Sequence, residues 1–400
     1  MVRVGVGLLV GTVAWSAPFT AATAVLLPAR IAEIAPDDKL RLLALLTAVA
    51  ALVALPSNIV LGTLSDRTRT RFGSRTPWIV GGATAVALLM VPLAAADSFA
   101  AVLGWWCLVV ICLNGPTAAL NAVLPDRVPV SRRATISALV GLGILLGAAI
   151  GSVLGAVFLT EPARGFQVVG LVSVVLAIAS VVIAPDHASP ASRGNVRRAP
   201  VDLKSMFAVP RHAADFYWAL AGRLALVLGY FMVNGYQLYI LTDHVGLDDA
   251  RAAQVLGTNA LLFLLTAIIG TVLAGPLSDR LQRRKPFVIG ASLLSMVAVS
   301  FPLFAATTTA MYAFALVGGV AFGAYFSVDS ALMSEVLPNH DARARDLGIL
   351  NTANTGGQAL APAASSLLVG LGLGFGPVFV GSLLICAVGA ALIVPIRSVR

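Results

Sequence analysis

The sequence predicts an all-α integral membrane protein with twelve transmembrane helices, built as two six-helix repeats with both termini in the cytoplasm. Three observations predict this fold. First, the 400 residues are 58% hydrophobic and 11% charged, with a mean hydropathy of +0.93, whereas soluble domains contain about 25% charged residues. Second, apolar stretches recur along the whole chain. Third, basic residues gather in alternate loops, and one loop motif occurs twice.

The twelve predicted spans follow from length and hydropathy. An α-helix rises about 1.5 Å per residue, so about 20 apolar residues cross the hydrocarbon core of a bilayer. Segments of this kind lie at residues 4–29, 42–64, 77–96, 99–124, 134–159, 166–184, 216–241, 252–277, 286–306, 310–337, 347–369 and 376–396. Each is expected to form one helix across the membrane.

The distribution of basic residues orients these helices. Of the 27 Lys and Arg residues, 21 lie in the termini and loops of one side, five lie on the other side, and Arg223 lies within a span. Because positively charged loops stay in the cytoplasm, both termini are predicted to be cytoplasmic. The net charge of +9 then reflects contact with the anionic headgroups of the cell membrane, and we expect no nucleic-acid partner.

The chain is expected to form two domains. Residues 185–215 are polar and rich in Pro, Ala, Ser and Arg, which is typical of a linker. We therefore predict an N-terminal six-helix bundle over residues 1–184, a cytoplasmic linker over 185–215, and a C-terminal six-helix bundle over 216–400.

The two halves repeat one another. The hexapeptide Gly62–Arg67 (GTLSDR) is matched 213 residues later by Gly275–Arg280 (GPLSDR). A Leu-Pro pair at 124–125 is matched at the same offset by Leu-Pro at 337–338. Duplicated six-helix units are typical of secondary transporters, which bind their substrate between the repeats. The repeat therefore predicts a transporter.

The repeated hexapeptide and its neighbouring arginines are predicted to form a conformational latch. The Asp can bind free backbone N–H groups at a helix end, and the arginines can pair with acids at the inner ends of spans four and ten. The alternative is a basic loop that only orients the adjacent helices. The predicted latch consists of Gly62, Asp66, Arg67, Arg71, Arg75, Asp126, Gly275, Asp279, Arg280, Arg284 and Glu335.

These residues also carry a family resemblance. The segment from Gly62 to Pro77 and its second copy resemble the loop motif of the major facilitator superfamily. The run SDRTRTRFGSRTPW at 65–78 and the fourth-span pattern Asn114-x-Pro116 are similar to the glycoside–pentoside–hexuronide cation symporters and their sucrose-transporter relatives. The resemblance implies a rocker-switch carrier that works by alternating access, with a cavity lined by spans 1, 4, 7 and 10.

One departure from that branch bears on the coupling ion. The cation-symporting sugar carriers have acidic residues in span two before the motif glycine, but residues 54–62 (ALPSNIVLG) contain none. Hard cations need oxygen ligands that usually include a charge. The sequence therefore argues against a sodium site of that type in span two.

Two ionisable residues lie well inside the predicted spans, Arg223 in span seven and Asp329 in span ten. A charge at the bilayer centre costs about 2.5–3.5 kcal/mol or more, so such residues usually face protein or water and are functional candidates. We expect the two to pair, with Asp329 as the proton carrier, because loss of the Arg contact during rocking would favour protonation of the carboxylate. The alternative is an interfacial Arg223 and a purely structural Asp329.

Polar and aromatic side chains at helical spacing predict a wet cavity that binds solute. Uncharged amides hydrogen-bond hydroxyl groups in both directions, which suits a sugar, although amides also join helices in membranes. The candidate substrate-binding residues are Trp15, Phe19, Asn114, Asn121, Tyr230, Asn234, Gln237, Tyr325, Asn351, Asn354 and Gln358. Trp105, Trp106 and Trp218 are instead expected in interfacial belts.

The function predicted from these features is proton-coupled transport of a small neutral polar solute, such as a sugar or glycoside, by a monomer. The alternative is a proton antiporter that exports a drug or secondary metabolite. We predict no enzyme activity, cofactor, catalytic residue or metal site, because the four histidines lie in loops or the linker without His-Glu-x-x-His spacing. A channel would not explain the duplicated motif.

Overall fold

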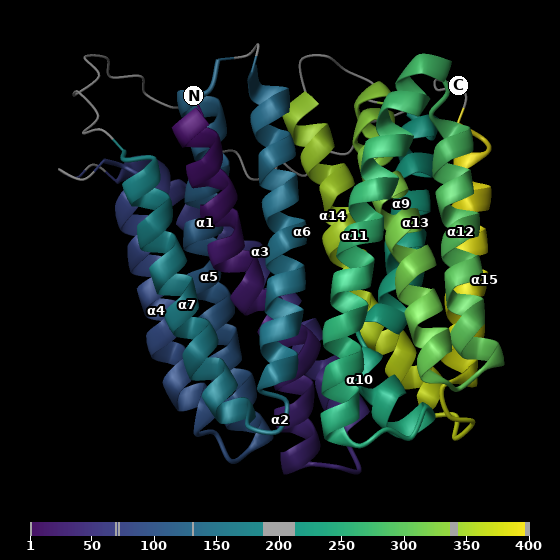
Figure 1. The fold of residues 1–400 in the computed structure, drawn as a ribbon. Coiled ribbons are helices and arrows are strands. Elements are labelled where there is room, and N and C mark those ends of the chain that lie inside the picture. Colours follow the sequence, from purple (N-terminus) through teal and green to yellow (C-terminus); the bar gives the residue numbers. More distant parts are fainter. Residues whose placement is uncertain are drawn as a thin grey trace. The chain divides into compact units, whose positions relative to one another are not determined.

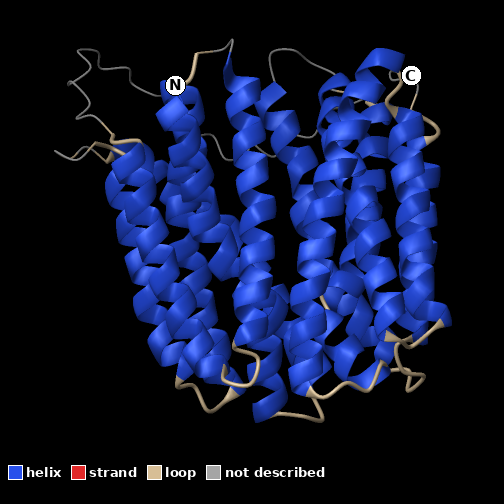
Figure 2. Ribbon diagram, viewed as in Figure 1, coloured by secondary structure: helices blue, strands red, loops and turns tan. Residues whose placement is uncertain are grey.

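The computed structural model describes residues 2–68, 70, 73–129, 132–186, 213–336 and 343–396. Every regular element in these segments is a helix (Figure 2). Arg71 and most of the predicted linker lie outside the described residues. So do the side chains of Asp66, Asp126, Glu335 and Asn351, whose backbones are described.

The helices of the first half follow the predicted order (Figure 1). A five-residue π-helical segment, η1, interrupts the first helix. The elements are α1 (Val2–Ala21), η1 (Ala22–Leu26), α2 (Leu27–Ile34), α3 (Lys39–Arg67), α4 (Thr76–Ala94), α5 (Phe99–Arg127), α6 (Arg133–Val157) and α7 (Pro162–Ile183).

The second half begins with a similarly interrupted helix. The chain turns after α9, and a π-helical segment, η3, follows the short α10. The elements are α9 (Ala214–Asn234), α10 (Gln237–Tyr239), η3 (Ile240–His244), α11 (Asp249–Leu281), α12 (Lys285–Phe304), α13 (Thr308–Glu335), α14 (Arg343–Val369) and α15 (Gly376–Ile393).

The chain forms two compact units. One comprises Met1–Arg193 and Leu247–Ala260, and the other comprises Gly194–Gly246 and Leu261–Arg400. Each has its own core. In the first unit Leu8, Ala83 and Leu120 are buried together, and in the second Phe216, Val288 and Leu332 are.

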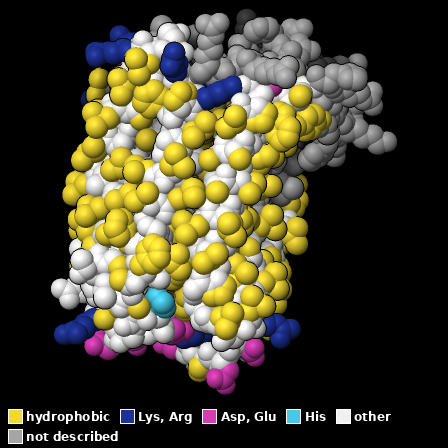
Figure 3. Space-filling model, turned by 90° about the vertical axis from the view of Figure 1, so that its right-hand side faces the viewer, with side chains coloured by type: hydrophobic (Ala, Val, Ile, Leu, Met, Phe, Trp, Pro, Cys, Tyr) yellow, Lys and Arg dark blue, Asp and Glu magenta, His cyan; other side chains and the backbone are white. Residues whose placement is uncertain are grey.

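Eleven helices in the described part of the chain are long and apolar enough to cross a membrane. The twelfth predicted span, 347–369, is also helical, but Thr352, Asn354 and Gln358 lower the mean hydropathy of α14. Large hydrophobic side chains lie on the outside of the helices, where lipid replaces water as the solvent. Figure 3 shows one such face, covered by hydrophobic side chains between two charged ends.

Glycines allow close helix packing in each half. A Cβ atom at Gly147 of α6 would collide with Ser16 of α1, and one at Gly323 of α13 would collide with the backbone of Ala267 on α11. Small residues at such contacts let the helix backbones approach one another closely.

Serine hydroxyls fasten the last helix of each half to the first. In the N-terminal half Ser173 and Ser180 of α7 donate to the carbonyl oxygens of Ala14 and Gly7, each at 2.7 Å. In the C-terminal half Ser382 of α15 donates to the carbonyl oxygen of Gly229 on α9 at 2.7 Å. The first and last helices of each half are therefore neighbours joined by hydrogen bonds between buried groups.

Candidate functional site

A buried ion pair lies in the C-terminal half. Arg223 on the buried face of α9 meets Asp329 of α13, with Nε 3.3 Å from Oδ2 and side-chain exposures of 11% and 5%. The predicted contact is confirmed. Arg223 lies about 14 Å along α9 from its start and Asp329 about 9 Å along α13 from its end, at 1.5 Å per residue. The pair is thus well inside both helices.

The two ends of the Arg223 guanidinium differ. Nε faces the carboxylate, although the two groups are not aligned for a hydrogen bond. Across the described segments, no hydrogen bond holds the terminal nitrogens Nη1 and Nη2. An arginine fork of this kind can still bind two acceptor oxygens at once.

Three polar residues that follow Arg223 in the sequence, Tyr230, Asn234 and Gln237, are linked by hydrogen bonds between their side chains. Gln237 donates to Oδ1 of Asn234 at 3.4 Å, and Asn234 donates to the hydroxyl of Tyr230 at 2.8 Å. Tyr230 is 5% exposed and packs against aromatic rings, with centroids 5.3 Å away for Phe322 and 6.5 Å away for Phe314. The structure therefore places Tyr230 where it orients the Asn234 amide.

The other predicted amides are placed differently. Asn114 of α5 accepts from Asn58 of α3 at 3.0 Å and donates to a backbone carbonyl of its own helix, so it joins two helices. Asn121 is exposed. On α14 Gln358 donates to Asn354 at 3.3 Å. The places of these side chains do not show whether they bind solute, so their role in substrate binding stays a prediction.

The aromatic residues correct one prediction. Trp106 is 1% exposed, so its expected place in an interfacial belt is wrong. Its ring stacks at 6.2 Å on Phe19, which is 36% exposed. Trp15 packs against the core of the N-terminal half. Phe19 thus remains the more accessible of the two predicted aromatic contacts on α1.

The first copy of the repeated loop surrounds a buried serine. Nη1 of Arg75, which is 8% exposed, donates to Oγ of the fully buried Ser65 at 3.0 Å. The backbone N–H of Arg75 donates to Oδ2 of Asp186 at 2.9 Å. Gly73, at φ +93°, lies against Asp186 so closely that a Cβ would collide with the carboxylate. The loop is therefore fastened to the chain that leaves α7.

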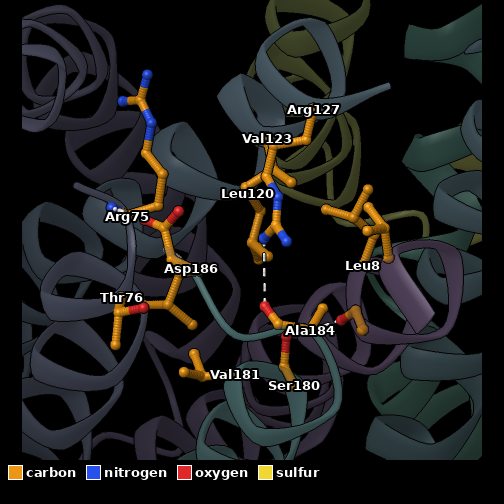
Figure 4. Close-up of a pocket in the computed structure, with 13 residues that line it drawn as sticks. Leu8, Arg75, Thr76, Leu120, Val123, Arg127, Ser180, Val181, Ala184 and Asp186 are labelled. Carbon is orange, nitrogen blue, oxygen red and sulfur yellow. Dashed lines mark hydrogen bonds between the residues drawn. The ribbon is translucent and has the colours of Figure 1, made fainter. Parts of the chain in front are cut away.

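A small cavity lies beside this contact (Figure 4). Asp186 and Thr76 form one wall, and Arg127 of α5 reaches across to donate to the carbonyl oxygens of Ala184 at 3.3 Å and Pro185 at 3.0 Å. Sequence reasoning missed Asp186, because it was assigned to the linker. Its position directly after a span was the available signal.

The second copy repeats this contact with a shorter loop. Nη1 of Arg284 donates to Oγ of the fully buried Ser278 at 3.2 Å and also pairs with Asp279. Arg284 directly precedes α12, as Arg75 directly precedes α4. The two serines were also missed, although both copies of the hexapeptide contain one.

The remaining described members of the predicted latch make no contact that points to a latch role. Arg67 and Arg280 are exposed. A Cβ at Gly62 or Gly275 would lie 3.7 Å from its nearest neighbour, which is ordinary contact, so neither glycine is required for close approach. The predicted acid partners have side chains outside the described residues.

Comparison with known proteins decides the family. The model of the family described as "MFS/sugar transport protein" matches residues 39–392. The chain belongs to this family. Its members are transporters of the major facilitator superfamily, as the loop motif and the repeat predicted, and the chain is accordingly a multi-pass membrane protein of this family.

Two curated proteins are similar in sequence. An MFS-type transporter, pynF, of Aspergillus niger is 28% identical over 241 residues, which cover 56% of this chain and 52% of that protein. The cis,cis-muconate transport protein of Acinetobacter baylyi is 25% identical over 291 residues, covering 69% and 68%. The chain thus matches about half of the fungal relative's length.

Solved structures of the superfamily share the fold. A bacterial homologue of the human lysosomal transporter Spinster superposes with a TM-score of 0.72 at 15% identity, covering 97% of this chain and 95% of that one. The nucleoside transporter NupG also gives a TM-score of 0.72, at 13% identity, with coverages of 98% and 99%. The predicted fold of two six-helix repeats is confirmed.

Proposed function

We propose that the protein moves a small polar solute across the cytoplasmic membrane by alternating access, as a monomer, with protons as the coupling ion. The observation that carries the proposal is the Arg223–Asp329 pair in the interior of the C-terminal half. Ionisable groups inside a membrane transporter are costly and mark ion or substrate paths.

The pair supports coupling through charge balance. Ionised, the two side chains compensate one another in a site where their exposures are 11% and 5%. Protonation of Asp329 would leave the arginine without a counter-charge, which favours either a rearrangement of the helices or an anionic ligand. Proton binding and a change of state are thereby linked at one position.

For the solute, a sugar or glycoside is the first candidate. Asn234, Gln237 and Asn354 are partly exposed amides that can both donate to and accept from hydroxyl groups. The family description, which includes sugar transport, supports this class.

A small carboxylate is the second candidate, supported by the unengaged terminal nitrogens of Arg223. Bidentate pairing of a guanidinium with a carboxylate is a strong and specific contact. The Acinetobacter baylyi relative is named for cis,cis-muconate, a dicarboxylate. On this proposal the solute takes the place of Asp329 on the arginine when Asp329 is protonated.

We further propose that the Ser65–Arg75 and Ser278–Arg284 contacts are the working parts of the predicted latch. Each buries a serine and holds the start of the following helix to the end of the preceding one. In the first copy the backbone N–H of Arg75 also donates to Asp186, which follows α7, so the end of α7 is held to the same loop.

The test is transport by purified protein in liposomes with an imposed pH gradient, using sugars, glycosides, aliphatic carboxylates and hydrophobic drugs as solutes. We expect accumulation of one class, dependent on the gradient and lost in Asp329→Asn. Asp249→Asn, which changes an exposed acid, is the matched control and should transport normally. Accumulation of the solute inside the liposomes that requires an outward-directed proton gradient would instead identify a proton antiporter, as expected of an exporter. Gradient-driven transport that survives in Asp329→Asn would refute coupling at this residue.

A further inference from the structure

We propose that a cavity inside the C-terminal half holds water and that Tyr325 passes protons between this water and Asp329. The inference rests on the proposed coupling role of Asp329 and deepens it by assigning the route of the proton. It is carried by the cavity, by an unpartnered hydroxyl group in its wall, and by the position of both beside the ion pair.

The cavity lies between α9, α12 and α13. Its wall includes Leu226 and Val227 of α9, Ser292 and Ser295 of α12, and Tyr325 of α13. The centre of a water molecule can occupy about 20 Å³ of it, and about 10–15 Å³ is enough for one water. Size alone thus permits occupation.

The wall also offers suitable partners for water. The hydroxyl groups of Ser292 and Ser295 donate to the carbonyl oxygens of Val288 at 2.7 Å and Ala291 at 3.0 Å, which leaves both oxygens able to accept. The Tyr325 hydroxyl is buried and has no hydrogen-bond partner among the residues described. Buried hydroxyl groups are rarely left unpaired, and ordered water usually supplies the missing partner.

Tyr325 connects this cavity to the ion pair. It lies four residues before Asp329 on α13, which places both side chains on one face of the helix. One helical turn separates the two residues, so the hydroxyl is expected close to the Asp329 carboxyl group, although it makes no hydrogen bond to it in this structure. Among the side chains that the structure describes, Arg223 faces the carboxylate, Tyr230 and Tyr325 line the cavity, and α12 contributes the two serines.

The proton transfer can be written as a relay. A hydronium ion in the cavity gives a proton to the Tyr325 oxygen, while the Tyr325 O–H gives its own proton to the Asp329 carboxylate. The hydronium becomes water, the tyrosine is unchanged, and the aspartate becomes neutral. Release follows the same steps in reverse. The relay serves a carboxylate whose side chain is only 5% exposed.

The test needs no solute. A rapid pH drop on the purified protein, followed by infrared spectroscopy, should reveal the carbonyl band of protonated Asp329, which Asp329→Asn assigns by its absence. Tyr325→Phe keeps the ring but removes the hydroxyl, and Ser292→Ala with Ser295→Ala removes both serine hydroxyl groups without adding bulk to the cavity. We expect both variants to slow the appearance of the band at least tenfold.

Tyr312→Phe, a tyrosine of the same helix outside the cavity wall, is the matched control and should retain the native rate. Unchanged rates in both cavity variants would overturn the relay, while a band that still titrates would leave the coupling role of Asp329 standing. If the native protein shows no assignable band at any pH at which it is folded, both the relay and the proposed coupling role are refuted. Thermal unfolding of each variant shows whether it is folded.

Discussion

Removal of one member of the buried ion pair should cost far more stability than removal of both. In Arg223→Leu the carboxylate of Asp329, whose side chain is 5% exposed, loses its only charged partner in the described structure. Breaking a buried pair from one side costs about 3–5 kcal/mol, because an uncompensated charge stays behind. Replacing both partners with apolar residues is often neutral. The double variant Arg223→Leu/Asp329→Leu should therefore be close to the native protein.

The protein contains its own probes for the assay. Cys107, Cys112 and Cys386 are free thiols within helices, and Cys386 is buried, so a thiol-reactive dye reports unfolding on heating. For a unit of about 200 residues, 1 kcal/mol corresponds to about 2–4 °C. Arg223→Leu should lower the unfolding temperature by about 6–20 °C, and this loss should shrink at acidic pH, where protonation neutralises the unpaired carboxylate.

The double variant Arg223→Leu/Asp329→Leu controls for any loss of stability caused by the changed side-chain volume and by the packing of the new leucines. If it loses as much stability as Arg223→Leu, the loss arises from packing rather than from an unpaired charge. An unchanged unfolding temperature in Arg223→Leu would refute the reasoning in a different way, because it would mean that the carboxylate is solvated in the native state.

Two further predictions concern packing and the repeated loop. Trp106→Ala should destabilise the protein by about 3–5 kcal/mol, as expected for a buried aromatic and not for an interfacial one; Trp218→Ala, at an exposed position, is the control, and equal losses would contradict the buried assignment. Asp186→Ala should change the rate of transport by at least threefold, because it releases the loop from the end of α7. Transport at the native rate would exclude a latch role for that contact, and Asp97→Ala serves as the exposed control.

Much of the fold was predictable because the membrane imposes long apolar helices and an orientation rule on the sequence. The Arg223–Asp329 contact was predictable for a related reason. Charges inside spans are so costly that two opposite charges at similar depth on different helices of one half are expected to meet. In both cases a strong physical constraint acts on a small number of residues.

The missed features depend on side-chain direction, which hydropathy does not encode. Trp106 lies in an apolar span where a ring can face either lipid or protein, and only its burial in the structure, at 1% exposure, decides between them. Asp186 lies more than one hundred residues from the loop that it contacts. Ser65 and Ser278 are small polar residues whose importance depends on guanidinium groups ten and six residues further along the chain.

The serine hydrogen bonds between the first and last helices join the beginning and the end of each half within that half. Ser180 and Ser382 make these contacts within their own halves, each to a backbone carbonyl that no side-chain substitution on the partner helix can remove. Covalent continuity between the halves is then not what holds either bundle together. A protein cut in the segment between α7 and α9, or produced as two separate polypeptides, should therefore still yield two folded six-helix modules able to associate.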